Sequence, residues 1–161
     1  MRKFEKISFE QFKKDIKDDK ELYESYLLPT RSTKKSAGYD IRSLEEYTLK
    51  PGESKVFPTG LKVSMNDDEV FNLYIRSSLG YKYNVTLTNG VGVIDSDYYN
   101  NSDNEGHFKL KLTNHGDKEL EVKIGDRIAQ GIFMKYLIVE DEEEIINERI
   151  GGIGSTNKEG K

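Results

Sequence analysis

The segment Arg76-Ser77-Ser78-Leu79-Gly80 places a guanidinium group, two hydroxyls and a small residue directly after an apolar stretch. Arginine binds phosphate oxygens in a fork, and small residues allow backbone amides to approach an anion closely. We therefore interpret the segment as a candidate phosphate-binding turn. An exposed turn without a ligand is the alternative, and the segment taken alone favours it because such turns are common.

A second candidate lies in Ile94-Asp95-Ser96-Asp97-Tyr98. Side chains two positions apart on a strand share a face, so the pattern predicts that Asp95 and Asp97 point one way while Ser96 points the other. Asp95 follows an apolar run, and partial desolvation suits a carboxylate that acts as a general base. A solvated strand end is the alternative, which spacing alone favours.

The third candidate is Gly151-Gly152-Ile153-Gly154-Ser155-Thr156. A dinucleotide-binding turn is excluded because no strand–helix unit surrounds it, and a P-loop is excluded because the spacing to Gly160-Lys161 is wrong. We interpret the segment as a glycine-hinged arm that brings Arg149, Ser155 and Thr156 over a phosphate. A tail without function is the alternative, and composition alone favours it.

The elements that position these residues are predicted to be short strands. Alternating apolar and polar residues predict half-buried antiparallel strands. Such alternation occurs in 70–75, 108–112 and 120–124. Asn89-Gly90, between the apolar residues of 85–87 and 91–93, predicts a hairpin. A further apolar strand is expected at 134–139. Several short strands at close spacing predict an all-β fold, a jelly-roll-like β-barrel or sandwich.

The N-terminal segment has a different pattern. Ser8 and Gln11 form a capping-box pattern, and Phe9, Phe12 and Ile16 recur at helical spacing. We predict a short amphipathic helix near residues 8–19 that packs on its own domain; a partner-docking helix is the alternative. The expected organisation is an N-terminal extension with this helix, a β-rich core, and an acidic linker with a flexible, glycine-rich C-terminal arm. Their boundaries are 1–26, 27–139 and 140–161.

Composition narrows the classes of function. The chain has 161 residues, which suits one domain. Its net charge of −4 disfavours binding of a nucleic acid polymer, and the absence of cysteine excludes disulfides and thiol chemistry. Only two histidines are present, which argues against a histidine-rich zinc site. No apolar run approaches the roughly 20 residues of a membrane helix, and residues 1–19 lack the apolar core of a secretory signal. We expect a cytoplasmic protein with no membrane partner.

Taken in chain order, five segments resemble the five motifs of the trimeric dUTP diphosphatases (dUTPases). They are Ala37-Gly38-Tyr39-Asp40-Ile41, Arg76 to Gly80, Asn89 to Tyr98, Gly125-Asp126-Arg127-Ile128-Ala129-Gln130, and Gly151 to Thr156. The resemblance spans about residues 27–157. It implies a jelly-roll-like protomer, a homotrimer with active sites at the subunit junctions, and Mg²⁺-assisted hydrolysis of dUTP to dUMP and pyrophosphate.

The resemblance also implies roles for the residues that match the motifs. Asp95 would be the catalytic base that activates water for attack on the α-phosphorus, and Asp40 would contact Mg²⁺ through water. Phosphate groups would be bound by Arg76, Ser77, Ser78, Gln130, Arg149, Ser155 and Thr156. Uracil would lie beside Asn89 and the backbone around Val93 and Ile94, with Ile153 and Gly154 closing over it. Tyr98 would pack under the sugar and exclude a 2′-hydroxyl.

The chain departs from the family pattern in three places. Ile153 stands where the family usually has a phenylalanine that covers the uracil, and the arm is one residue shorter between Arg149 and the glycine pair. A polar insertion, Asn101 to Gly106, follows the third motif.

Two other functions are weighed against the diphosphatase. A dCTP deaminase of the same fold depends on a glutamate in its pocket, where this chain has Asp95. A nucleotide-gated binding module would use the N-terminal helix and the polar insertion as contact surfaces.

Overall fold

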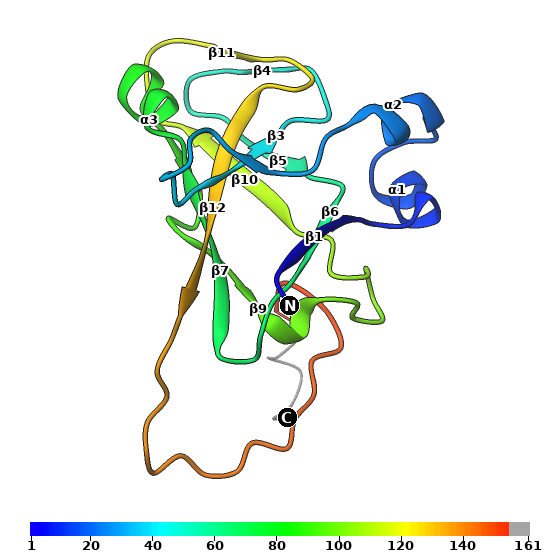
Figure 1. The fold of residues 1–161 in the computed structure, drawn as a ribbon. Helices are drawn as coiled ribbons and strands as arrows, with labels where there is room; N and C mark the ends of the chain where they lie inside the picture. Colours follow the sequence, from blue (N-terminus) through cyan, green and yellow to red (C-terminus); the bar gives the residue numbers. More distant parts are fainter. Residues whose placement is uncertain (155–161) are drawn as a thin grey trace.

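The computed structural model describes residues 1–154, which form mainly short β-strands in four sheets (Figure 1). In chain order the elements are β1 (Lys3–Lys6), α1 (Phe9–Asp15), α2 (Lys20–Ser25), β2 (Thr30–Arg31), β3 (Tyr39–Arg42), β4 (Tyr47–Leu49), β5 (Ser54–Pro58), β6 (Leu61–Ser64), β7 (Glu69–Ile75), α3 (Ser77–Tyr83), β8 (Val85–Leu87), β9 (Gly92–Asp95), η1 (Ser96–Tyr98), β10 (Lys109–Asn114), β11 (Leu120–Val122) and β12 (Arg127–Lys135). None of the helices in this part of the chain is long and apolar enough to cross a bilayer. The predicted all-β, jelly-roll-like fold class is confirmed.

The largest sheet has five antiparallel strands in the order β2-β3-β12-β7-β9. β12 lies at its centre and pairs with β3 on one side and with β7 on the other. β9 is an edge strand, and its last residue, Asp95, lies opposite Val70 near the start of β7. One sheet therefore carries candidate residues from β3, β9, β12 and the end of β7.

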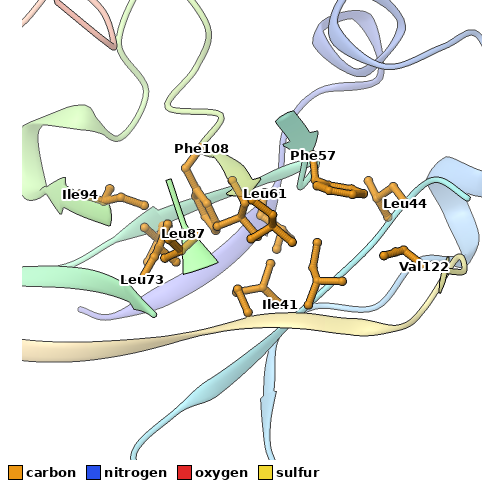
Figure 2. Close-up of a cluster of buried hydrophobic side chains, with 14 of the residues drawn as sticks. Ile41, Leu44, Phe57, Leu61, Leu73, Leu87, Ile94, Phe108 and Val122 are labelled. Carbon is orange, nitrogen blue, oxygen red and sulfur yellow. The ribbon is translucent and has the colours of Figure 1, made fainter. Parts of the chain in front are cut away.

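Apolar side chains at alternate strand positions form one buried cluster (Figure 2). Leu73 and Ile94 enter it from the five-stranded sheet, whereas Phe57 and Leu87 enter from the β5-β10-β8 sheet. Phe108, just before β10, is also buried there. Burial of each such side chain contributes roughly 1.5–3 kcal/mol to the stability of the fold. The apolar residues that alternate in the sequence therefore hold the sheets together.

The N-terminal segment packs on the same core. β1 pairs with β6, and Phe12 of α1 is fully buried, stacked on the ring of Tyr26 at 5.8 Å. The helix predicted near 8–19 is shorter than expected, because α1 ends at Asp15. The side chain of Asp19 accepts a hydrogen bond from the Leu22 amide and so caps a second helix, α2. Packing of α1 on its own domain is confirmed.

The predicted hairpin around Asn89-Gly90 is wrong. The turn itself forms, with Gly90 at φ 75°, but the strands on its two sides join different sheets. β8 pairs with β10, whereas β9 pairs with β7. Gly92 on β9 packs directly against Leu73, and a Cβ at this position would lie only 3.0 Å from Leu73 Cβ. Long-range packing therefore decides the partners that a local turn signal cannot.

The apolar strand predicted at 134–139 is also wrong, because β12 ends at Lys135. This residue pairs with Glu69, the first residue of β7, so β7 offers no further partner. Leu137 and Ile138 are consequently exposed, at 97% and 67%. Beyond them the chain leads away from the sheets and returns toward β9 and η1 (Figure 1).

Candidate active site

A cavity of about 540 Å³ lies between β9, η1, the loop before β10 and the returning segment 149–154. Its lining includes eight residues assigned to catalysis or substrate binding from the sequence: Asn89, Val93, Ile94, Asp95, Tyr98, Arg149, Ile153 and Gly154. Segments more than 50 positions apart in the chain thus contribute to one concave site. A concave site with a few polar groups is the usual form of a small-molecule site.

Asp95 is at the mouth of this cavity, with its side chain about half exposed. The guanidinium of Arg149 bridges two carboxylates. Its Nη2 lies 2.5 Å from Asp95 Oδ2 and its Nε lies 2.6 Å from Asp97 Oδ1. Arg149 is itself mostly covered, at 18% exposure, and both residues of the pair line the cavity.

The prediction that Asp95 and Asp97 share a strand face is wrong in its geometry. β9 ends at Asp95, and Asp97 belongs to the 3₁₀ turn η1. The two carboxylates still converge, because both meet the guanidinium of Arg149.

Tyr98, the last residue of η1, is held through its hydroxyl. The hydroxyl donates to the His107 backbone carbonyl at 3.1 Å and accepts from Asn104 Nδ2 at 2.8 Å. Burial raises the pKa of Tyr98 above its ordinary value of 10.0. Asn104 was missed at the sequence level. Its only signal was the insertion itself, which is rich in the Asn, Asp and Gly residues of turns.

A second group of candidate residues surrounds Asp40 on β3. Its buried carboxylate lies 2.5 Å from Arg76 Nη1 and 3.3 Å from Arg127 Nη1, and it accepts from Ser32 Oγ at 2.9 Å. Gln130 on β12 lies opposite Asp40 in the pairing of β12 with β3. We call Asp40, Arg76, Arg127 and Gln130 the arginine cluster.

The structure corrects the predicted phosphate-binding turn. Arg76 is the N-cap of helix α3, and Ser77 and Ser78 are exposed in its first turn. The Leu79 amide already donates to the Arg76 carbonyl at 3.0 Å, so the first-turn amides left without a partner in the helix, and suited to an anion, are those of Ser77 and Ser78. The hydroxyls and amides suited to a phosphate are present, but on a short helix.

The cavity and the arginine cluster are far apart within one chain. Asp95 lies opposite Val70, whereas Arg76 follows the far end of β7, six positions beyond Val70. At roughly 3.3 Å per residue this separation is on the order of 20 Å. Hydrogen bonds need roughly 3 Å, so within one chain Arg76 cannot bind the phosphate group at which Asp95 would activate water. Ser155 and Thr156 lie outside the described residues.

Among residues 1–154, no three His, Asp or Glu side chains gather as ligands for a metal ion. Asp40 and Asp95 both have arginine partners. The donor set therefore fits only an ion held mainly by oxygens from a ligand and water, as Mg²⁺ accepts.

Three comparisons with known proteins agree. The dUTPase family model matches residues 24–157. The deoxyuridine 5′-triphosphate nucleotidohydrolase of Lactococcus lactis is 49% identical over 130 residues, covering 80% of this chain and 87% of that protein. The enzyme of the same name from Nautilia profundicola is 38% identical over 143 residues, covering 86% and 96%.

Solved structures give the same result. The crystal structure of dUTPase from Streptococcus mutans has a TM-score of 0.66 and 42% identity, covering 71% of this chain and 89% of that one. A dUTPase of Staphylococcus bacteriophage 80alpha, 22% identical, shares the fold with a TM-score of 0.65 over 97% and 98% of the two chains. The resemblance drawn from the five segments is confirmed: the chain belongs to the dUTPase family.

Proposed function

We propose that this protein hydrolyses dUTP to dUMP and pyrophosphate. The observation that carries the proposal is the cavity in which Asp95, at the end of β9, lies among residues suited to a base, a sugar and a phosphate chain. Membership of the dUTPase family and the names of the relatives support it.

Asp95 acts as the general base. Its carboxylate accepts a proton from a water molecule whose oxygen attacks the α-phosphorus. The bond between the α-phosphorus and the bridging oxygen to the β-phosphorus breaks, pyrophosphate leaves, and the water oxygen stays on dUMP. General-base assistance of this kind contributes typically about 10²–10⁴-fold to the rate. The half-exposed position of Asp95 supports this role because part of its carboxylate is accessible to water.

Arg149 changes partners during this reaction. In the structure its guanidinium binds Asp95 and Asp97. When the triphosphate enters, its oxygens compete for the same guanidinium and release Asp95 for water. Ser155 and Thr156 then assist Arg149 at the outer phosphates.

Uracil is selected at the inner end of the cavity. Asn89 lies beside it, and the backbone of Val93 and Ile94 presents hydrogen-bonding groups to its edge. Ile153 and Gly154 cover the base. An unpaired buried polar group opposes the wrong base more strongly than a small size difference does.

The active enzyme is a homotrimer. The separation of the cavity from the arginine cluster supports this, because a neighbouring protomer can bring its Arg76, Ser77, Ser78 and Gln130 to the phosphates. Exposed Leu137, Ile138 and Val139 also support assembly, because solvated apolar patches mark interaction surfaces.

Mg²⁺ fits this site as a companion of the substrate. When bound, it offsets charge on the triphosphate and on the leaving pyrophosphate. Asp40 would reach it through water, since Arg76, Arg127 and Ser32 already contact both carboxylate oxygens. We propose a cytoplasmic location, as expected from the sequence.

Pyrophosphate release from dUTP, dCTP, dTTP and UTP tests the function. We expect dUTP to be hydrolysed and the other three to react poorly. Ammonia release from dCTP would instead indicate the deaminase. Binding of dUTP without any hydrolysis would indicate the nucleotide-gated module.

A further inference from the structure

The polar insertion, Asn101 to Gly106, lies within a loop of residues 99–107 that is bonded to the N-terminal segment. The hydroxyl of Tyr99 donates to the Glu5 carboxylate. The Glu105 carboxylate accepts from both the amide and the hydroxyl of Ser8, at 2.9 and 2.5 Å. The loop therefore cannot shift without breaking contacts to β1 and to the cap of α1.

His107 fixes the other end of the loop. It is fully buried, and its Nε2 accepts from the Gly60 amide at 2.9 Å. Nδ1 therefore carries the proton and donates to Asp15 Oδ2 at 2.5 Å. Since both ring nitrogens are occupied, the backbone carbonyl of His107 is held in one place.

The amide of Asn104 has only one orientation that satisfies its neighbours. The Gly106 amide can only donate, and it lies 3.0 Å from Asn104 Oδ1. Nδ2 must therefore face the hydroxyl of Tyr98, 2.8 Å away. Because that hydroxyl accepts from Asn104, its own proton goes to the His107 carbonyl. The position of the Tyr98 hydroxyl is thus determined by two directional bonds.

We propose that Asn104 is a positioning residue that fixes the Tyr98 ring and thereby sets the preference for a deoxyribose over a ribose. This inference rests on the proposed function, in which Tyr98 packs under the sugar. A ring held at its hydroxyl cannot move away to admit a 2′-hydroxyl. A ring released at that end can tilt, because Tyr98 is only partly buried.

The test is a double-mutant cycle read as the ratio of kcat/KM for dUTP to kcat/KM for UTP. Asn104→Ala is expected to lower this ratio about three- to tenfold, the value of one or two hydrogen bonds. Most of the change should appear as a lower KM for UTP. Tyr98→Phe should lower the ratio by a similar factor, and Asn104→Ala should add nothing in the Tyr98→Phe background.

Tyr99→Phe is the matched control. Tyr99 belongs to the same loop, and its hydroxyl donates to the Glu5 carboxylate rather than to Asn104 or Tyr98. This variant should leave the ratio unchanged. An equal fall of the ratio in Tyr99→Phe would show general loosening of the loop and overturn the proposal.

Two further outcomes overturn the proposal. The first is an unchanged ratio in Asn104→Ala. The second is a full effect of Asn104→Ala in the Tyr98→Phe background. Failure of the proposed function is distinguishable: the wild-type protein would then not hydrolyse dUTP, or Tyr98→Ala would leave the ratio unchanged.

Discussion

The cavity around Asp95 and the arginine cluster around Asp40 are built in opposite ways. The cavity exposes part of the Asp95 carboxylate to solvent and is lined by polar and apolar groups from distant segments. The cluster instead buries its carboxylate and uses it to hold two arginines. The difference fits the proposed function, in which the first region would carry the reaction and the second would present positive charge in a fixed direction.

The sharpest test of the cavity is Asp95→Asn. The amide cannot accept a proton from water, so kcat should fall about 10²–10⁴-fold. Binding of dUTP, measured by calorimetry, should change little because the shape of the side chain is kept. Asp97→Asn is the matched control, since Asp97 contacts the same guanidinium, and it should retain most of the turnover. Near wild-type turnover in Asp95→Asn would mean that the assigned base is wrong.

The returning segment is tested by a chain that stops after Asn147. It should stay folded, because the strands of residues 1–154 all end by Lys135. Its kcat/KM for dUTP should fall roughly ten- to hundredfold, as expected for lost charge-assisted hydrogen bonds. Arg149→Ala should reproduce much of this loss. Full activity of the shortened chain would refute the role of the arm.

In the arginine cluster, Asp40→Ala should affect folding first. Removing a buried carboxylate leaves Arg76, at 23% exposure, without its partner, and the free energy of unfolding should fall by about 2 kcal/mol. Urea unfolding measures it. Asp68→Ala is the control, because the pair of Asp68 with Lys135 is exposed and should contribute less than about 1 kcal/mol. Equal losses in both variants would contradict the structural role of Asp40.

His107, which fixes loop 99–107 next to the cavity, should make the free energy of unfolding depend on pH. Burial lowers the pKa of His107 below 6.5; Asp15 and Glu105 oppose this change, whereas Lys109 adds to it. The unfolded chain therefore binds the proton more readily, so stability is complete above about pH 6.5 and declines as the pH falls below it. The slope should not exceed about 1.4 kcal/mol per pH unit.

The measurement is the free energy of unfolding from urea titrations between pH 7 and 5, for the wild type and for His107→Gln. The difference between the two proteins should shrink as the pH falls. A difference that stays constant across this window would rule out His107 as the source.

Local patterns predicted the parts of the fold that depend on local chemistry. Alternation located β7, β10 and β11, and Asn89-Gly90 located its turn, because these depend on a few neighbouring residues. The pattern could not predict the partners of β8 and β9, which are chosen by packing between distant segments. The cap at Asp19 was a local signal in the sequence for the start of α2, a helix that lies beyond the predicted range of 8–19.

For the site, the sequence likewise predicted which residues take part, but not how far apart they lie. The five segments contain seven of the eight predicted residues that line the cavity, and Arg149 lies just before the last segment. The separation of Arg76 from Asp95 emerged only from the register of β7 with β9. Asn104 escaped notice because its importance depends on one hydroxyl six positions earlier in the chain.

The bonds that hold loop 99–107 to the N-terminal segment have a consequence for the order of folding. These bonds join residues that are 92 to 97 positions apart in the chain. Contacts that close such long stretches of chain carry a large entropic cost and form slowly. Asp95, in contrast, belongs to a strand that pairs with its sheet neighbour only about 25 positions away. We therefore expect β9 to pair with β7 before loop 99–107 is fixed to the N-terminal segment.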